Sequence, residues 1–216
     1  NRLSDANHAS LNSLAGRQMT PIDPMADDVV KDLYGKILVI TIPLLTLGVP
    51  PNPVNGFLAH STNLGATWVV PVPNNGGIGT MGRATLGVGA PGDSVVYAFA
   101  ARTSNTRQKD LYKSVNGGLT WTAIGLGQYV TAPEGNPPVP VTRWVGKVPE
   151  NPYSYQTTMD IMFDQPSYNQ MLLVDPSDPS RNTVYIGGQF SSAKTTNGGT
   201  TWRVVSAWLA QNGLPY

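Results

Sequence analysis

One eight-residue phrase occurs three times in the chain and constrains its fold more than any other feature. The phrase has the frame [S/T]-x-N-x-G-x-T-W and covers residues 61–68, 114–121 and 195–202. Its hydroxyl and Asn side chains can bond nearby backbone amides, its Gly permits positive φ, and its Thr-Trp pair suits the start of a strand. We assign a structural role to Ser61, Asn63, Gly65, Trp68, Ser114, Asn116, Gly118, Trp121, Thr195, Asn197, Gly199 and Trp202. Each copy is therefore predicted to be a hairpin turn held by its own side chains.

Short runs of β-forming residues surround each copy in the same order. Strand, turn, strand, loop, strand, phrase and strand follow one another over 80–126 and 169–207, and a shorter form of this order covers 36–79. We therefore predict that each unit is a four-stranded antiparallel sheet. The phrase tryptophans are 53 and 81 residues apart, against about 40 to 50 residues for one propeller blade. The longer interval predicts an inserted loop over 127–168. Residues 1–35 are harder to interpret, because 26–34 fits a turn of helix as well as the start of a partial blade.

The repeated phrase resembles the Asp-box, or BNR repeat, of sialidase-like β-propellers, with Asn at positions 63, 116 and 197 where Asp is more usual. Residues 89–98, 175–179 and 184–188 look like blades of the related xyloglucanase-type and sortilin-type propellers. The resemblance implies an all-β propeller fold, with the box on the face away from the active site and serving structure. Closed propellers need at least about four blades. Because only three boxes occur, we expect an incomplete propeller or a fragment of a larger one.

The composition narrows the class of protein and of partner. Charged residues make up 12% of the chain, Gly and Pro number 23 and 19, and the net charge is +1, which indicates a turn-rich β protein with no electrostatic footprint for nucleic acid. There is no cysteine, and His8 and His60 are far apart, which argues against zinc. No apolar run is long enough for membrane insertion. We expect a bacterial protein that is secreted, periplasmic or on the cell surface, and interpret the sequence as a piece of a longer one.

A ligand site is expected on the face opposite the boxes. If the strands run outward from the axis, antiparallel order brings 46–55, 102–109 and the insertion together there. The insertion holds five candidate ligand-binding residues, namely Arg143, Trp144, Tyr153, Tyr155 and Tyr168. Aromatic rings stack on sugars and charged groups bond their hydroxyls, so these residues favour a glycan-binding cleft. The competing interpretation is that the aromatic residues hold a long loop against the rim of the sheet.

Catalysis is a second hypothesis. Glycoside hydrolysis needs two carboxyl groups facing one another, and Asp160 and Asp164 are the candidates in the insertion. The motifs of true sialidases are missing, and Glu134 and Glu150 are the only glutamates. No cofactor is expected, although Asp175 and Asp178 in a Pro-rich turn could bind Ca²⁺. His60, just before the first box, is interpreted as a strand-end residue.

Three functions follow from these observations. The first is a module that binds a carbohydrate or protein ligand through its loop-rich face. The second is a sialidase-like or xyloglucanase-like glycoside hydrolase with part of its active site outside this chain. The third is a structural or assembly module. The remaining blades of a longer chain, or another subunit, are a further expected partner.

Overall fold

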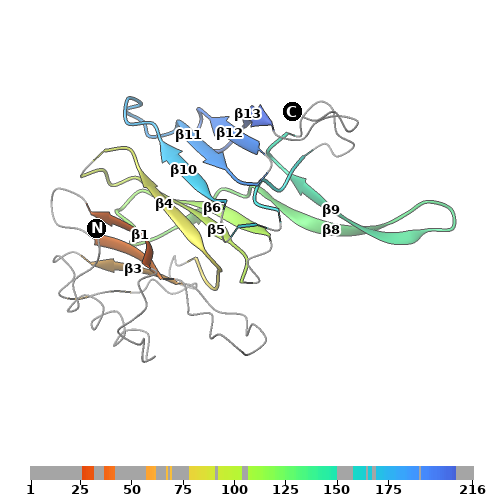
Figure 1. Cartoon of the computed structure of the whole chain (residues 1–216). Coiled ribbons are helices and arrows are strands. Elements are labelled where there is room, and N and C mark those ends of the chain that lie inside the picture. Colours follow the sequence, from red (N-terminus) through yellow and green to blue (C-terminus); the bar gives the residue numbers. More distant parts are fainter. Residues whose placement is uncertain are drawn as a thin grey trace.

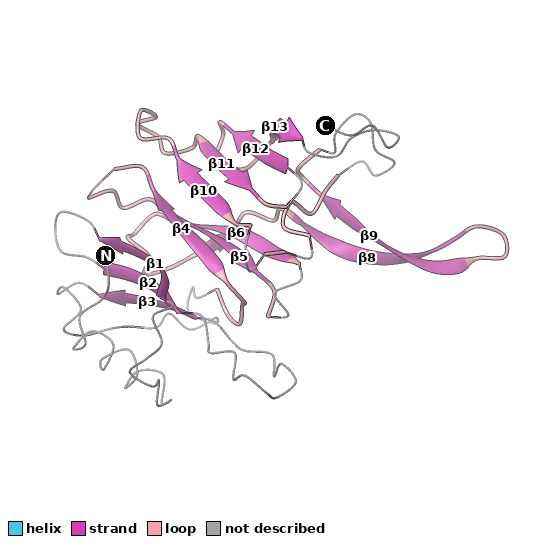
Figure 2. Cartoon of the chain, in the orientation of Figure 1, coloured by secondary structure: helices cyan, strands magenta, loops and turns pink. Residues whose placement is uncertain are grey.

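The protein is described here by a computed structural model. It describes residues 26–31, 37–41, 57–61, 67, 69, 78–90, 92–103, 107–149, 158–163, 165–166, 169–189 and 191–207, with the backbone alone at 26–31, 37–41, 57, 61 and 207. Every regular element in this part of the chain is a β-strand (Figure 2), so the expected all-β class is confirmed. No helix in the described part is long and apolar enough to cross a membrane.

The first sheet holds strands β1 (Ala26–Lys31), β2 (Ile37–Thr41) and β3 (Phe57–Ser61) in antiparallel order. Val69 joins this sheet through two backbone hydrogen bonds of 2.8 Å with His60. The alternative of a helical turn at 26–34 was wrong, because 26–31 is a strand paired with β2. The first blade therefore begins at residue 26 rather than 36. Residues 1–25 and 46–55 lie outside the described part.

The second and third sheets are complete four-stranded antiparallel meanders. The second contains β4 (Ala84–Val88), β5 (Val96–Ala101), β6 (Gln108–Ser114) and β7 (Thr122–Ala123). The third contains β10 (Met171–Val174), β11 (Val184–Gly187), β12 (Ser191–Thr195) and β13 (Arg203–Ala207). A four-stranded meander repeated side by side is the blade architecture of a β-propeller. The chain thus forms part of a propeller.

The first strands of the blades lie next to one another. Strand β4 contacts β1 on one side and β10 on the other (Figure 1), as expected for innermost strands gathered around a propeller axis. Gly87 of β4 makes close approach possible, since a Cβ there would lie 3.0 Å from Leu172 Cγ and 3.2 Å from Val174 Cγ2 of β10. A larger side chain at position 87 would push the two blades apart.

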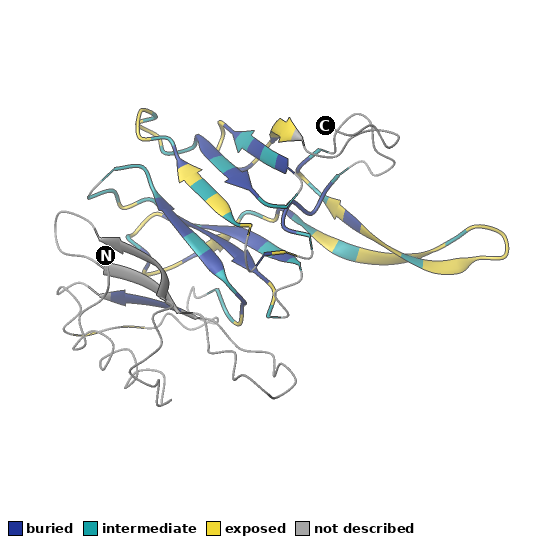
Figure 3. Cartoon of the chain, in the orientation of Figure 1, coloured by how far each residue is buried: buried dark blue, intermediate teal, exposed yellow. Residues whose placement is uncertain are grey.

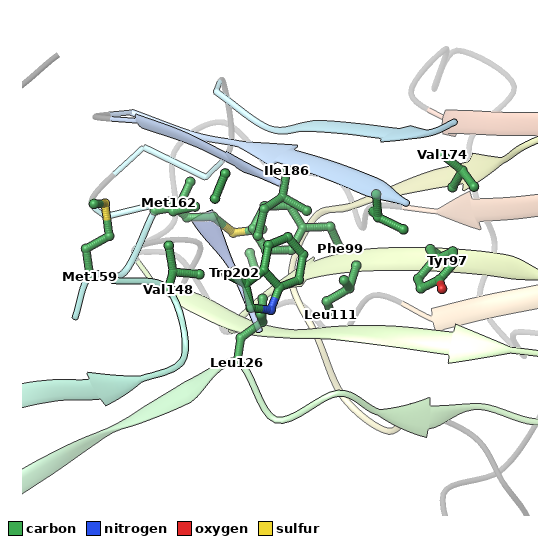
Figure 4. Packing of buried hydrophobic residues seen from close by; sticks show 14 residues of the cluster. Tyr97, Phe99, Leu111, Leu126, Val148, Met159, Met162, Val174, Ile186 and Trp202 are labelled. Atoms are coloured by element: carbon green, nitrogen blue, oxygen red, sulfur yellow. The ribbon is translucent and has the colours of Figure 1, made fainter. Parts of the chain in front are cut away.

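Two apolar layers hold the blades together. One contains Leu58, Leu86 and Tyr112 and lies between the first and second blades. The other lies between the second and third blades, where Tyr97, Phe99, Leu111, Val174, Ile186 and Trp202 gather (Figure 4). Burying a side chain of this size stabilises the fold by about 1.5 to 3 kcal/mol. These layers fix the relative position of the blades and of the segments attached to them.

The insertion between the second and third blades is not the expected loop. Strands β8 (Gly127–Glu134) and β9 (Val139–Gly146) pair antiparallel over eight residues each. They form a hairpin that projects away from the three sheets (Figure 1). The segment 158–163 then returns to the core, where Met159, Ile161 and Met162 are buried between the second and third blades.

Candidate functional site

The two described boxes have the same internal geometry. In the second blade Asn116 Oδ1 accepts hydrogen bonds from Ser114 Oγ and Thr120 N, both at 2.9 Å, and Asn116 Nδ2 donates to Thr120 Oγ1 at 2.8 Å. The amide of Gly118 donates to Ser114 Oγ at 2.8 Å, and Trp121 Nε1 donates to the Gly118 carbonyl at 3.0 Å. All these bonds close within eight residues. The turn is therefore held by its own side chains.

The box of the third blade repeats this network bond for bond. Asn197 Oδ1 accepts from Thr195 Oγ1 at 3.0 Å and from Thr201 N at 2.9 Å, and Trp202 Nε1 donates to Gly199 O at 3.1 Å. Gly199 has a φ of 94°, in the region that favours glycine. Asn63, Gly65 and Trp68 of the first box lie outside the described residues, as does the side chain of Ser61.

The loop-rich end of the second blade forms a polar cluster at the base of the hairpin. Asp160 is 5% exposed. Its carboxylate accepts hydrogen bonds from the amides of Gln108, Met162 and Phe163 at 3.0 to 3.3 Å, and from the Tyr129 hydroxyl at 2.8 Å. Strand β6, the hairpin and the segment 158–163 are thus joined at one side chain.

Aromatic and cationic groups complete this cluster. The rings of Tyr129 and Trp144 meet edge to face with centroids 5.2 Å apart. The guanidinium groups of Arg102 and Arg107 lie 5.4 and 5.5 Å from the Tyr129 ring centroid, and Arg107 lies 4.0 Å from that of Phe163. We call Arg102, Arg107, Gln108, Tyr129, Trp144 and Asp160 the hairpin root. Two of the three stretches expected to converge, 102–109 and the insertion, meet here.

Burial raises the pKa of Asp160 above its ordinary value, because desolvation outweighs the hydrogen bonds that the carboxylate accepts. A raised pKa in a carboxyl group is one mark of a catalytic acid. Geometry gives the opposite indication, since donors from its own protein surround the carboxylate and it is closed to solvent. Asp160 therefore caps a turn, and among the described residues its carboxylate is occupied by donors of its own chain. Asp164 lies outside the described residues.

A second buried carboxylate was missed by the sequence analysis. Asp110 lies inside β6 and accepts hydrogen bonds from the amides of Leu111 and Leu126 at 2.8 Å and of Gly125 at 3.0 Å. Desolvation raises its pKa above the ordinary value. Asp110 fixes the chain where β7 leads into the hairpin. An acidic residue between apolar positions of a strand was the available signal, because such a group is rarely buried without partners.

The predicted ligand-binding residues of the insertion do not form one site among the described residues. Trp144 is 4% exposed and forms part of the hairpin root, so its ring is not available for stacking on a ligand. Arg143 lies on the exposed part of β9 and pairs with Glu134 across the hairpin. Tyr153, Tyr155 and Tyr168 lie outside the described residues.

The turn proposed for Ca²⁺ is held by local hydrogen bonds. Asp175 Oδ1 accepts from Ser177 N and Oγ at 2.9 and 2.6 Å. Asp178 accepts from the amides of Ser180, Asn182 and Thr183 at 2.7 to 3.0 Å. Within the described ranges no group of three acidic or His side chains is placed to hold a metal ion.

The hairpin has two different faces, because paired residues of an antiparallel ribbon point to the same side. One face carries the pairs Tyr129–Trp144, Thr131–Thr142 and Pro133–Pro140. The other, which we call the valine face, carries Val130, Val139, Val141 and Val145 together with Gln128, Ala132 and the ion-paired Glu134 and Arg143. Val130, Val139 and Val145 are 38%, 54% and 55% exposed (Figure 3). The projecting ribbon thus presents a row of exposed valines, with one ion pair among them.

Two solved structures show a partial likeness to the chain. One is a GH74 enzyme from Niastella koreensis, with 15% identity and a TM-score of 0.36 over 85% of this chain. The other is a GH74 xyloglucanase from Xanthomonas campestris, with 13% identity and a TM-score of 0.30 over 83% of this chain. The chain spans only 24% and 29% of their lengths. No protein-family model and no curated protein matches the sequence. The propeller assignment therefore rests on the sheet order of the chain itself.

Proposed function

We propose that this chain is a non-catalytic β-propeller module that binds a protein partner along the valine face of its hairpin. The observation that carries the proposal is the hairpin itself, with valines exposed on one face from Val130 to Val145 and its base fixed in the core. Exposed apolar side chains that gather on one face favour an interaction site, and the Arg143–Glu134 pair adds polar groups to this one. An isolated two-stranded ribbon is also marginally stable in water, so a partner would stabilise it.

The root of the hairpin supports a binding role because it restricts the motion of the arm. The Tyr129 hydroxyl is bonded to Asp160, and Trp144 is buried beside it. A Cβ at Gly127 would lie 2.5 Å from the Trp144 ring, and one at Gly146 would lie 2.6 Å from its Nε1 atom. A preorganised arm loses less conformational entropy on binding than a flexible loop. This favours recognition by the exposed part of the ribbon.

The same geometry argues against a carbohydrate ligand and against a hydrolase. A glycan platform needs exposed aromatic rings, whereas Trp144 is buried and two guanidinium groups lie near the half-buried Tyr129 ring. A hydrolase needs a carboxyl group that reaches the glycosidic bond, whereas Asp160 is engaged by four donors of its own chain. A protein ligand fits the exposed valines better than either.

The proposal is tested by changing the valine face without changing the fold. Threonine keeps the β-branched shape that strands favour but adds a hydroxyl, so Val130→Thr, Val139→Thr and Val145→Thr are combined in one variant. A photo-crosslinker at position 141 should give one main adduct in extracts of the producing cells, and the triple variant should lose it. Val115→Thr, on the 64%-exposed valine of the box turn, is the matched control and should keep it.

Binding to polysaccharides is measured on the same variants by affinity electrophoresis. Retardation in a polysaccharide gel, together with adducts that survive the triple substitution, would refute a protein ligand and favour a carbohydrate. Circular dichroism of every variant shows whether the fold is retained.

A further inference from the structure

The second and third blades can be compared position by position, because their strand registers agree. Val96 pairs with Ser114 of the second box and Val184 pairs with Thr195 of the third. Counting from these pairs, Tyr97 corresponds to Tyr185 and Lys113 to Lys194. On the innermost strands, Gly87 pairs with Tyr97 and Leu173 pairs with Tyr185. Gly87 and Leu173 therefore occupy equivalent positions. The two blades therefore present equivalent residues on equivalent faces.

In the second blade this face is covered by the third blade. Tyr97 is fully buried, and its hydroxyl donates to the Arg181 carbonyl at 2.8 Å. Lys113 lies over the Tyr97 ring, with 5.5 Å from Nζ to the centroid, and donates to Asn182 Oδ1 at 2.8 Å. Both acceptors belong to the turn between the first two strands of the third blade. Tyr97 and Lys113 thus bind the first turn of the next blade through these two hydrogen bonds.

The third blade repeats the pair, and among the described residues no further blade covers it. Lys194 Nζ lies 4.8 Å from the Tyr185 ring centroid, in the arrangement of Lys113 and Tyr97. Leu173 and Met171 on the same face are 53% and 45% exposed, and β10 has exposed segments in Figure 3. Within the described chain, neither Tyr185 Oη nor Lys194 Nζ makes a hydrogen bond. We call Met171, Leu173, Tyr185 and Lys194 the open face.

We propose that the open face is a docking surface for a further propeller blade, which is not among residues 26–207. Its first turn would offer a main-chain carbonyl to Tyr185 Oη and an amide oxygen of an Asn or Gln side chain to Lys194 Nζ, as Arg181 and Asn182 do one blade earlier. Leu173 occupies in the third blade the position that Gly87 occupies in the second, where the missing side chain allows β10 to approach closely. The partner's innermost strand therefore carries a small residue opposite Leu173. This inference is independent of the proposed function, which concerns the hairpin.

The test adds a blade that already packs on the equivalent face of the second blade. A second copy of residues 169–207 is joined after Ala207 through a flexible linker, and Leu173→Gly in the receiving blade recreates the face that already accepts this blade. The chain has no cysteine, so Met171→Cys makes the open face its only thiol. The labelling rate of this thiol by a maleimide then reports whether the added blade covers the face.

Docking should slow the labelling about tenfold or more, which corresponds to about 1.4 kcal/mol. Tyr185→Ala with Lys194→Ala in the receiving blade should restore the rate, whereas a Val115→Cys control thiol should react at the same rate throughout. The proposal fails if the added copy leaves the rate at position 171 unchanged, or if protection survives loss of Tyr185 and Lys194. Protection that appears without the added copy and grows with protein concentration would assign the face to self-association and would also overturn it.

Discussion

Replacing Asp160 decides whether this carboxyl group holds the fold or performs chemistry. In Asp160→Ala, the amides of Gln108 and Met162, both from fully buried residues, lose their acceptor, as do the partly exposed Phe163 amide and Tyr129 hydroxyl. Each buried group left without a partner costs about 1 to 3 kcal/mol. Counting only the two fully buried residues, we expect Asp160→Ala to lower the free energy of unfolding by about 2 to 6 kcal/mol.

Asp160→Asn separates the hydrogen bonds from the charge. The remaining oxygen still accepts from Met162 and Phe163, and the Tyr129 hydroxyl can rotate to accept from the new amide, so the loss should be about 1 kcal/mol. Because the folded-state pKa of Asp160 lies above the unfolded value of 3.8, the stabilisation linked to its protonated form is complete below that pH and is lost as the pH rises through the folded pKa. The difference in stability between wild type and Asp160→Asn should therefore shrink as the pH rises through the folded pKa.

The assay is urea unfolding followed by tryptophan fluorescence over a series of pH values that starts at about pH 4, the ordinary pKa of this group. Asp110 also has a raised pKa but is present in both proteins, so its contribution largely cancels. Trp144 and Trp202 report on the hairpin root and the third blade. A loss below about 1 kcal/mol in Asp160→Ala would refute the reasoning, because the carboxylate would then contribute little to stability and a functional role would have to be reconsidered.

Three further predictions concern other polar groups. Asn116→Asp keeps the acceptor for the Thr120 amide and should change stability by less than about 0.5 kcal/mol, whereas Asn116→Ala should cost about 1 kcal/mol in thermal unfolding; equal losses would contradict this. Gln108 is fully buried and its side-chain amide has no partner in the described chain, so Gln108→Met should raise the free energy of unfolding in urea by about 1 kcal/mol, and a lower free energy would show that a water pairs the side-chain amide. The Arg181 hydrogen bond lowers the pKa of Asp93, so this stabilisation is present above about pH 4 and lost as the pH falls through the folded pKa. Asp93→Asn should flatten the acid limb of the melting-temperature profile, and an unchanged limb would count against the pair.

The parts of the fold that could be predicted from sequence are those specified by neighbouring residues. The box bonds span no more than four residues, as between Asn116 and Thr120, so the turn chemistry can be recognised in the sequence. The same holds for apolar runs such as 37–41 and 184–187, whose β-branched residues suit a buried strand. Strand β1 was ambiguous because it begins Ala-Asp-Asp, a polar start that also suits the first turn of a helix.

The hairpin and its root were not predictable by the same means. Four prolines lie between Pro133 and Pro140 and favoured a loop, but they fall at the end of the ribbon, away from the core. The alternation Val139, Val141, Arg143, Val145 is regular, yet on a ribbon without a covering layer it does not show which face is buried. The contact of Asp160 with Gln108 joins residues 52 positions apart, which no local pattern specifies.

The contrast between the two ends of the blades indicates where function can change. At the box end, the second and third blades carry the same bonds at the same positions, and each network forms without residues from outside its own turn. At the other end, the bonds of Asp110 and Asp160 occur in the second blade alone among the described residues, and they attach the hairpin there. A substitution in a box should therefore alter the stability of one blade and leave the hairpin surface unchanged. A substitution in the hairpin root should move the valine face relative to the blades, and so should change partner binding before it unfolds the sheets.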